Sequence, residues 1–248
     1  MNSIILQTEN LEKSFSTEYG MHRVLKGISV DFFQGDFTAI MGESGSGKTT
    51  SMRNLDPKST YYIDCDKKGL SWKGWKTQYN AENKNYACTN DAQKVWGILA
   101  NISQKAPHIK TVIVDTVNGI MVGDEMRRAK EKGYDKWIDL AQCIWDMVDS
   151  IHLLRDDLTV IMSFHSETIK DDTGYTFTRI LTNGQKLQKI KLESKFTTVL
   201  LAKANNGEYC FEVHASNSTA KTPFGAYDKD VMTVPNDMAE VLKVMEDF

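Results

Sequence analysis

The sequence contains no apolar run that approaches the roughly 18–20 residues needed for a membrane-spanning helix. Its opening residues, MNSIILQTENLEKS, carry acidic side chains close behind a short apolar run, which is not the pattern of a signal peptide. Both absences predict a soluble protein of the cytoplasm.

Cysteine and proline are also scarce. The cysteines form no CxxC pair and have no histidine nearby at metal-ligand spacing; they are Cys65, Cys88, Cys143 and Cys210. We therefore expect free thiols, as in a reducing cytoplasm. None of the 4 prolines lies in a composition typical of a flexible linker, and there is no internal repeat.

An excess of basic charge is missing as well. Lysine and arginine number 30 against 33 aspartates and glutamates, which gives a net charge of -3 and a pI near 6.0. A nucleic-acid-binding function would therefore have to rest on a local basic patch.

What the sequence does contain is an ordinary globular composition, with 41% hydrophobic and 25% charged residues. Its 248 residues suffice for one large α/β domain or two small ones. Apolar or alternating runs predict strands at Ile4–Thr8, Val24–Phe33, Phe37–Met41, Tyr61–Cys65, Thr111–Asp115, Leu158–Phe164, Tyr175–Ile180, Thr197–Ala202 and Tyr209–His214. The last two flank Asn205-Asn206-Gly207, which predicts a hairpin.

Three helices are expected besides one that follows residue 47. The first covers Asp91–Lys105, with Asn90 as its N-cap in a capping-box arrangement. The second is a long amphipathic helix over Gly123–Arg155, divided near Gly133, and the third begins at Asn236. Strands alternating with helices from residue 37 to 164 predict an α/β fold with a mainly parallel sheet and antiparallel strands added at its edges.

Residues 42–49, Gly-Glu-Ser-Gly-Ser-Gly-Lys-Thr, match the P-loop pattern GxxxxGK[ST] without a mismatch. A short apolar strand precedes the motif, and a helix-competent run, Lys48–Leu55, follows it. Glycines let successive backbone N–H groups turn inward onto phosphates. Lys48 is expected to reach the β- and γ-phosphates and Thr49 to bind Mg²⁺. The predicted ATP-binding residues are Gly42, Glu43, Ser44, Gly45, Ser46, Gly47, Lys48, Thr49 and Thr50.

Thr111–Asp115 is the natural second half of this site. Four apolar or β-branched residues ending in a carboxylate describe a buried parallel strand whose end faces the ligand. Asp115 would then hold the Mg²⁺ hydration shell. The alternative is an aspartate that caps a turn.

From Ser44 to the C-terminus the chain resembles phage-encoded RecA-like ATPases of the single-strand-annealing group. The resemblance covers about 200 residues and rests on the segments GSGKTTSMRNLDPKSTYYIDCDKKGLSWKGW, HIKTVIVDTVNGIM, RAKEKGYDKW, LRDDLTVIMSFHSE and NSTAKTPFGAY. It implies a RecA-like core over residues 42–248 and an ATPase of DNA recombination in the host cytoplasm.

Residues 1–50 are similar to the opening of an ABC transporter ATPase, through ILQTENLEKSFSTEYGMHRVLKGISVDFFQGDFTAIMGESGSGKTT. That resemblance implies a β-subdomain over residues 1–41, in which Phe15 stacks on adenine, with Tyr19 as the fallback. The alternative for Phe15 is an edge-strand core residue. No LSGGQ-type signature occurs, and Thr116 rather than glutamate follows Asp115, so an ABC transport subunit is disfavoured. We favour an engineered chimera that joins two P-loop lineages within a single ATPase domain over residues 1–248.

Hydrolysis needs a group that orients the attacking water and a sensor of the γ-phosphate. Asp66 fits the acidic residue that ends the strand after the P-loop in RecA-like proteins, with Asp64 as an alternative. The alternative for Asp66 is a solvated turn residue. His165, with Ser163 as a lesser candidate, is the expected sensor, although a histidine that only satisfies a backbone carbonyl remains open. Asp124 and Glu125 are interpreted as structural, opening a helix near its positive dipole.

DNA binding is suggested by lysines spaced through 18 residues, Lys186, Lys189, Lys191, Lys195 and Lys203. Tyr175, Phe177 or Phe224 would stack bases, although spaced lysines are as typical of a solvated edge. The RecA-like resemblance implies rings or filaments, with a neighbour's basic residue from segment 182–195 completing the site. The leading hypothesis is a Mg²⁺-dependent ATPase, and its rival is a nucleotide-binding scaffold without turnover.

Overall fold

The computed structural model describes residues 4–17, 20–33, 37–132, 135–170, 172–182 and 191–245. The chain divides into two compact units, Met1–Gly35 and Asp36–Phe248. In the first unit, β1 (Ile4–Thr17) and β2 (Gly20–Phe33) pair as an antiparallel hairpin, and only their backbone pairing is described. Both strands are therefore longer than the sequence predicts at the ends nearest the turn.

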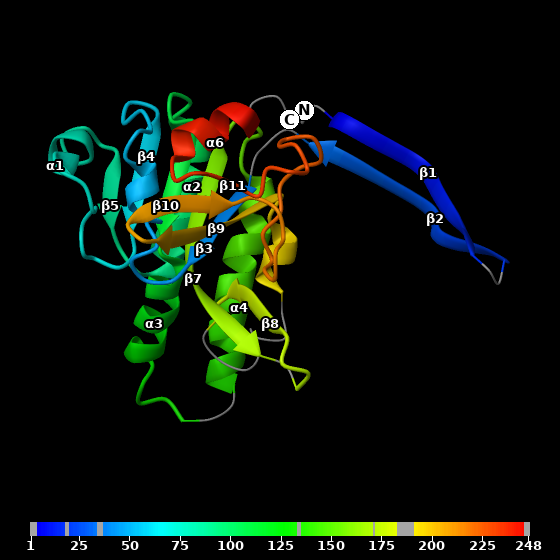
Figure 1. The fold of residues 1–248 in the computed structure, drawn as a ribbon. Coiled ribbons are helices and arrows are strands. Elements are labelled where there is room, and N and C mark those ends of the chain that lie inside the picture. Colours follow the sequence, from blue (N-terminus) through cyan, green and yellow to red (C-terminus); the bar gives the residue numbers. More distant parts are fainter. Residues whose placement is uncertain are drawn as a thin grey trace. The chain divides into compact units, whose positions relative to one another are not determined.

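The second unit is built on a mainly parallel sheet (Figure 1). Its strands are β3 (Phe37–Gly42), β4 (Thr60–Asp64), β5 (Tyr86–Cys88), β6 (Thr111–Asp115), β7 (Thr159–Lys170), β8 (Thr176–Ile180), β9 (Thr198–Asn205), β10 (Glu208–Glu212) and β11 (Thr233–Pro235). They run in the order β11-β10-β9-β3-β7-β6-β4-β5, and β8 pairs with the end of β7. The bonds between β9, β3, β7, β6, β4 and β5 are parallel, whereas β8, β10 and β11 join antiparallel. The predicted α/β class is confirmed.

Side chains alternate along the central strands and fill two separate cores. Ala39 and Met41 of β3 face the core beneath α2 (Ala92–Lys105), α3 (Val117–Arg127) and α4 (Asp135–Asp149). Ile40 faces the opposite core, which α6 (Met238–Met245) covers together with Met52. Both faces of β3 are therefore fully buried, and this burial fixes the register of the sheet, because a shift by one residue would exchange the side chains of the two cores.

The helix expected after the P-loop is much shorter than predicted. Only a 3-10 turn forms, Thr50–Met52, instead of a helix over Lys48–Leu55. Pro57 lacks an N–H and disfavours helical geometry at the preceding residue. The Asp56 carboxylate accepts a hydrogen bond from the Lys58 N–H at 3.0 Å, which stabilises a turn in place of a further helical turn.

The long helix predicted from residue 123 begins earlier. α3 starts after Thr116, whose hydroxyl accepts from the Gly119 N–H, and ends at Arg127. Asp124 therefore lies inside α3, where it pairs with Arg127 at 3.6 Å, so the proposed contact with a helix start is wrong. α4 begins at Asp135, and Gly133 lies outside the described residues.

Two smaller predictions also change. The N-cap of α2 is Asp91, not Asn90, because the Asp91 carboxylate accepts from the N–H groups of Gln93 and Lys94. The hairpin at Asn205-Asn206-Gly207 is confirmed, with positive φ at both Asn206 and Gly207 joining β9 to β10. The short strands β5 and β11 have no counterpart in the sequence prediction, since three residues carry too little periodicity to be recognised.

Candidate nucleotide-binding site

The P-loop leaves the sheet at Gly42, the last residue of β3. A Cβ at Gly42 would lie 2.5 Å from the Ser46 Oγ and 2.7 Å from the Ala202 carbonyl oxygen, so only glycine fits there. Gly45 and Gly47 have φ of 85° and 89°, which other residues rarely adopt. These backbone requirements explain the three glycines of the motif and give the loop its inward curl.

Lys48 lies almost fully buried within this curl. Its Nζ donates to the carbonyl oxygens of Gly42 at 2.7 Å and Glu43 at 2.8 Å. Burial lowers the pKa of Lys48 to about 8, against the opposing effect of the Asp115 carboxylate. An ammonium group that is desolvated and held only by neutral carbonyls gains from an anion placed beside it.

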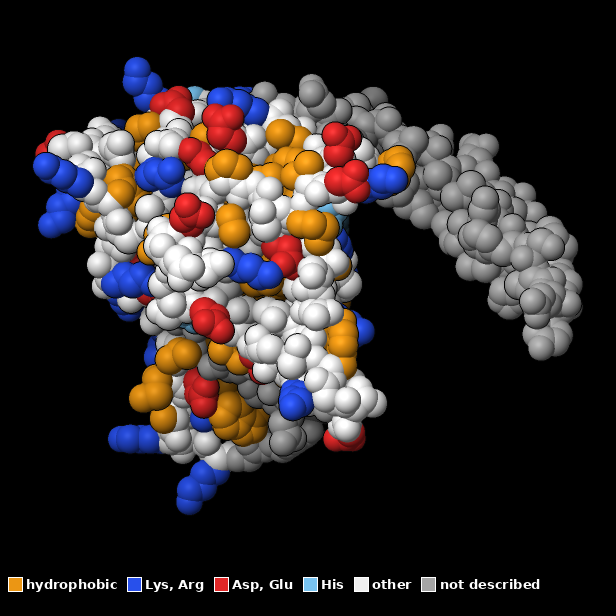
Figure 2. All heavy atoms as spheres, in the orientation of Figure 1, with side chains coloured by type: hydrophobic (Ala, Val, Ile, Leu, Met, Phe, Trp, Pro, Cys, Tyr) orange, Lys and Arg blue, Asp and Glu red, His pale blue; other side chains and the backbone are white. Residues whose placement is uncertain are grey.

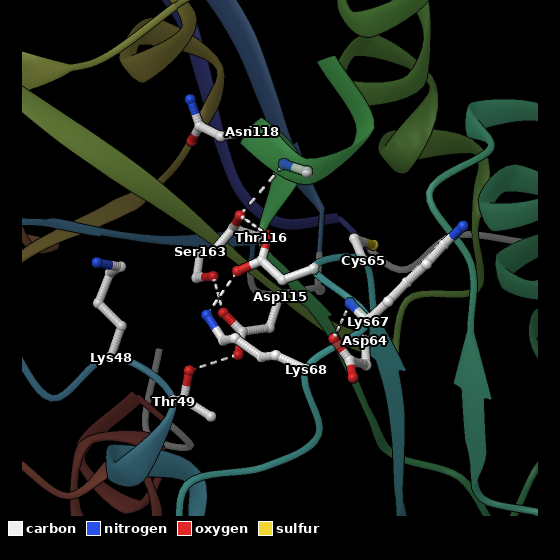
Figure 3. Close-up of polar contacts among 12 residues, drawn as sticks. Lys48, Thr49, Asp64, Cys65, Lys67, Lys68, Asp115, Thr116, Asn118 and Ser163 are labelled. Carbon is white, nitrogen blue, oxygen red and sulfur yellow. Dashed lines mark hydrogen bonds and ion pairs between the residues drawn. The ribbon is translucent and has the colours of Figure 1, made fainter. Parts of the chain in front are cut away.

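Asp115, at the end of β6, accepts hydrogen bonds from three hydroxyl groups, of which those of Thr49 and Ser163 are labelled in Figure 3. Its Oδ2 accepts from the Thr49 hydroxyl at 2.7 Å and from the Tyr62 hydroxyl at 2.6 Å, and its Oδ1 accepts from the Ser163 hydroxyl. The carboxylate is 3% exposed. The structure thus brings together Thr49 and Asp115, which stand 66 positions apart in the chain.

A hard cation such as Mg²⁺ fits this pair, because it prefers one or two protein oxygens and takes its remaining ligands from water and phosphate. Tyr62 and Ser163 would orient the carboxylate without binding the ion themselves. Sequence reasoning missed Tyr62 altogether. Its only local signal was an inward-facing position on a strand.

Asp66 lies two residues beyond the end of β4, next to the residue that follows Asp115. Its carboxylate accepts from the Thr116 hydroxyl at 2.8 Å and from the Lys68 ammonium at 2.6 Å. Burial raises the pKa of Asp66, but these two hydrogen bonds together with the nearby charge of Lys68 lower the pKa below its ordinary value. Asp66 is therefore an ionised, half-buried carboxylate near the phosphate loop.

Asp64, the alternative to Asp66, has a structural environment. It is 2% exposed and accepts from the N–H groups of Lys67 and Gly69, both at 2.8 Å, and from the Tyr86 hydroxyl at 2.9 Å. These contacts fix the turn after β4. A carboxylate with three such donors is held in place and has little freedom to meet a water molecule.

His165 is aligned with Gly42, its partner in the parallel register of β3 and β7. Its backbone N–H donates to the Asn118 side-chain oxygen at 2.7 Å, which anchors β7 to α3 at this point. Burial and the Lys48 ammonium lower the pKa of His165, so the imidazole is neutral at pH 7. His165 was predicted at the end of its strand, but β7 continues to Lys170 because it pairs there with β8.

An open groove of about 890 Å³ joins Asp66 and His165. The groove is also lined by Lys68, Asn118 and Arg127, so its polar groups come from the β4 turn and α3 as well as from β7. Gly119 forms part of the wall, and a Cβ there would lie 2.6 Å from the Asp66 Oδ1. The groove therefore gives water access to the two predicted catalytic residues.

The lysines predicted to contact DNA are less free to bind phosphates than their spacing suggests, because two of them are paired with carboxylates. Lys195 is hydrogen-bonded to Asp149, and Lys203 to Glu212. Lys191 is exposed, while Lys186 and Lys189, with most of segment 182–195, lie outside the described residues. On the face that Figure 2 shows, basic and acidic side chains are interspersed rather than gathered by sign.

Aromatic side chains remain accessible at the other predicted positions. Tyr175 is 49% exposed and stacks on Phe177 with ring centroids 6.4 Å apart, and Phe224 is fully exposed. Phe15 pairs through its backbone with His22 in the hairpin of the first unit, and its side chain lies outside the described part of the structure. Tyr19 lies outside the described residues altogether.

Comparison with known proteins places this site in a family context. Residues 37–226 match the model of the AAA_24 family, which is described as an AAA domain. No helix in the described part of the chain has the length and hydrophobicity of a membrane span.

Two curated relatives are named as export or import ATP-binding proteins. The bacitracin export ATP-binding protein BceA of Halalkalibacterium halodurans is 47% identical over 51 residues, which cover 21% of this chain and 20% of the relative. The phosphate import ATP-binding protein PstB 2 of Lactiplantibacillus plantarum is 29% identical over 153 residues, covering 60% and 56%. The chain thus spans less than two thirds of the length of these relatives.

A solved structure of a KaiC-like protein from Pyrococcus horikoshii matches 73% of this chain and 77% of its own, with 14% identity and a TM-score of 0.39. At this identity and TM-score, the similarity does not indicate the function of the chain.

Proposed function

This chain belongs to the AAA_24 family and is an ATP-binding P-loop ATPase domain, and from that premise we propose that it hydrolyses ATP to ADP and phosphate with Mg²⁺. The observation that carries the proposal is the 2.7 Å contact between the Thr49 hydroxyl and the buried Asp115 carboxylate, directly beneath the P-loop. These two groups are the protein ligands that a nucleotide-bound Mg²⁺ needs.

The P-loop residues 42–50 bind the phosphates in this proposal. Inward N–H groups and the Lys48 ammonium meet the β- and γ-phosphates, and phosphate charge offsets the desolvation that lowers the pKa of Lys48. The bound Mg²⁺ would neutralise charge that develops on the phosphoryl oxygens. Thr49, from the P-loop, and Asp115, from the end of β6, would hold the ion.

Asp66 and His165 are the proposed catalytic groups. Asp66 stays ionised through its bonds to Thr116 and Lys68, so it can accept a hydrogen bond from the attacking water and orient it. Neutral His165, beside Gly42, can hydrogen-bond the γ-phosphate or the same water. Both line one groove, which supports a shared role.

A steady-state phosphate-release assay tests turnover, with ATP binding measured in parallel. We expect Lys48→Ala to lose binding, and Asp66→Asn to keep binding but slow hydrolysis by about 10²–10⁴-fold, the typical contribution of acid–base groups. Asp157→Asn, an exposed carboxylate on the surface, is the matched control and should behave as wild type. Full activity in Asp66→Asn would remove that residue from the role of base.

The narrower role that we propose is in phage DNA recombination and single-strand annealing, within the host cytoplasm. The resemblance of residues 44–248 to that group supports it, as does the exposed ring of Tyr175, which stacks on the partly exposed Phe177 and on which a base can stack. Turnover should rise with single-stranded DNA, and Tyr175→Ala should reduce that stimulation without changing the basal rate. A rate that does not respond to DNA would leave the ATPase standing and refute the recombination role.

Assembly belongs to the same proposal. RecA-like ATPases form rings or filaments, and a basic residue of a neighbouring subunit would then complete the γ-phosphate site. Light scattering with and without MgATP tests this, since a particle that stays monomeric with nucleotide would contradict it.

A second candidate is a nucleotide-binding scaffold without turnover, expected of an engineered chimera. The division between Met1–Gly35 and Asp36–Phe248 supports it, because the family match begins at residue 37, close to the boundary between the two units. In this reading residues 1–248 form one nucleotide-binding domain, and the resemblance of residues 1–50 to ABC transporter ATPases implies that Phe15 stacks on adenine. Phe15→Ala should then weaken ATP binding. A rate of phosphate release at background, with ATP binding intact, would favour the scaffold over the ATPase.

A further inference from the structure

Two side chains from distant parts of the chain meet at Gly47, the last glycine of the P-loop. A Cβ at Gly47 would lie 2.8 Å from the Tyr209 Cδ1 and 3.0 Å from the Asn236 Oδ1. Tyr209 belongs to β10, and Asn236 lies between β11 and α6. Both therefore touch the phosphate loop, although neither takes part in the site described above.

Their place in the sheet is informative. β3 lies between β7 on one side and β9 on the other. Asp115 and His165, with Asp66 beyond them, come from the side of β7, β6 and β4, whereas Tyr209 comes from the opposite side through β9 and β10. A triphosphate whose γ end points toward Asp115 and His165 leaves its nucleoside on the opposite flank of the loop.

We propose that Tyr209 and Asn236 form the adenine subsite, with the Tyr209 ring stacking on the base and the Asn236 carboxamide reading its edge. This inference rests on the proposed binding of ATP. Tyr209 is 50% exposed, so part of its ring is open to a ligand even though its edge packs on Gly47. Stacking on an aromatic ring is a common means of holding a base.

Asn236 supplies the polar half of this subsite. It is 7% exposed, and its Nδ2 has no hydrogen-bond partner among the described residues. An unsatisfied buried donor is unusual in a folded protein. A carboxamide carries one acceptor and a donor group side by side, which matches the amino group and ring nitrogen on an adenine edge.

The position of Asn236 is fixed relative to the phosphate site. Its carbonyl oxygen accepts from the Arg53 Nη1 at 3.0 Å, directly after the 3-10 turn that follows the P-loop. The next residue, Asp237, accepts from the Asn54 side chain at 2.5 Å. Two contacts thus tie the segment before α6 to the residues that leave the P-loop, so a nucleotide would find both parts already in place.

Isothermal titration calorimetry with two probes tests this subsite, MgATP and inorganic tripolyphosphate with Mg²⁺. We expect Tyr209→Ala to weaken ATP binding by about 5–100-fold, the usual effect of losing a base-stacking ring, and to leave tripolyphosphate within about twofold. Tyr209→Phe, which keeps the ring, should bind ATP like wild type. Asn236→Leu, similar in shape but without a hydrogen-bond donor or acceptor, should also weaken the binding of ATP and leave that of tripolyphosphate unchanged. Leu153→Ala, which removes an exposed apolar side chain at the end of the 3-10 turn Ser150–Leu153, should leave the affinity for both ligands unchanged.

Several results would overturn the assignment. Unchanged ATP affinity in Tyr209→Ala removes the stacking contact, and an equal loss for both ligands shows that the variant only distorts the P-loop. If wild type binds tripolyphosphate as tightly as ATP, no base subsite exists, but the proposed phosphate site stands. If wild type binds neither, the proposed function and this inference both fail. If Tyr209→Ala does not fold, Tyr209→Trp provides the test instead. ATP must then change the fluorescence of the new tryptophan, whereas tripolyphosphate must not.

Discussion

Removing the Tyr62 hydroxyl tests whether the Asp115 carboxylate is positioned from the neighbouring strand. Tyr62 is fully buried and donates to the Asp115 Oδ2 at 2.6 Å, while Thr49 donates to the same oxygen at 2.7 Å. Burial, followed by the Asp115 charge, raises the pKa of Tyr62 well above its ordinary value, so the phenol always acts as the donor. Tyr62→Phe deletes this one donor and keeps the ring among Trp72 and Tyr79.

The expected magnitude follows from what remains. A hydrogen bond to a charged group contributes about 1.5–3 kcal/mol, and because Thr49 still donates to the same oxygen we expect a loss toward the lower end. For a chain of this size each kcal/mol lowers Tm by about 2–4 °C. Tyr62→Phe should also reduce the affinity for Mg²⁺ by about 10–100-fold, the typical cost of losing a group that orients a metal ligand.

Two measurements check the prediction: thermal unfolding without nucleotide, and calorimetric ATP binding over a range of Mg²⁺ concentrations. Tyr86→Phe is the matched control, because it removes a 2.9 Å hydroxyl contact to Asp64, a carboxylate that orients no metal. It should lower Tm without altering the Mg²⁺ dependence. If Tyr62→Phe shows the Mg²⁺ dependence of the control, the argument that Tyr62 positions Asp115 is refuted.

Three further predictions concern single positions. Gly42→Ala should abolish nucleotide binding, since the new methyl group would lie 2.5 Å from the Ser46 Oγ and 2.7 Å from the Ala202 carbonyl oxygen; binding retained at wild-type affinity in calorimetry would contradict the packing. Gly97→Ala in α2 meets open space at an exposed helical position and should stabilise the protein by about 0.5–1 kcal/mol, measured by urea unfolding. The pKa of His165 is lowered in the folded protein, so the unfolded chain binds more protons just below pH 6.5 and stability should fall as pH drops through that value. His165→Gln should flatten this part of the stability–pH curve, and an unchanged slope would exclude His165 as its source.

The parts of the site that are local in sequence could be predicted from the sequence. The P-loop is a contiguous backbone shape that needs glycine at fixed spacings, and Gly45 and Gly47 have the positive φ that such a turn requires. Asp115 was predictable because a buried parallel strand ends where the ligand binds. Local turn chemistry also gave the hairpin at Asn205-Asn206-Gly207.

Predictions that depended on length or on a competing local contact were less successful. The predicted length of the helix after the P-loop was too great, because Asp56 and Pro57 favour a turn that the helix-forming composition of Lys48–Leu55 does not reveal. The start of α3 was placed too late, because Thr116 caps a helix directly at the end of β6. In both cases one or two side chains decided a helix boundary that averaged helix propensity could not.

The sequence by itself determined that a P-loop motif at Gly42–Thr49 follows a buried strand and that another buried strand ends in the carboxylate of Asp115. Only the tertiary structure decided which groups surround that pair. Tyr62 meets Asp115 because β4 lies beside β6, and Tyr209 meets Gly47 because β10 reaches the P-loop from the opposite flank. Strand order is set by burial summed over the whole sheet, and no local pattern around either tyrosine records its neighbour.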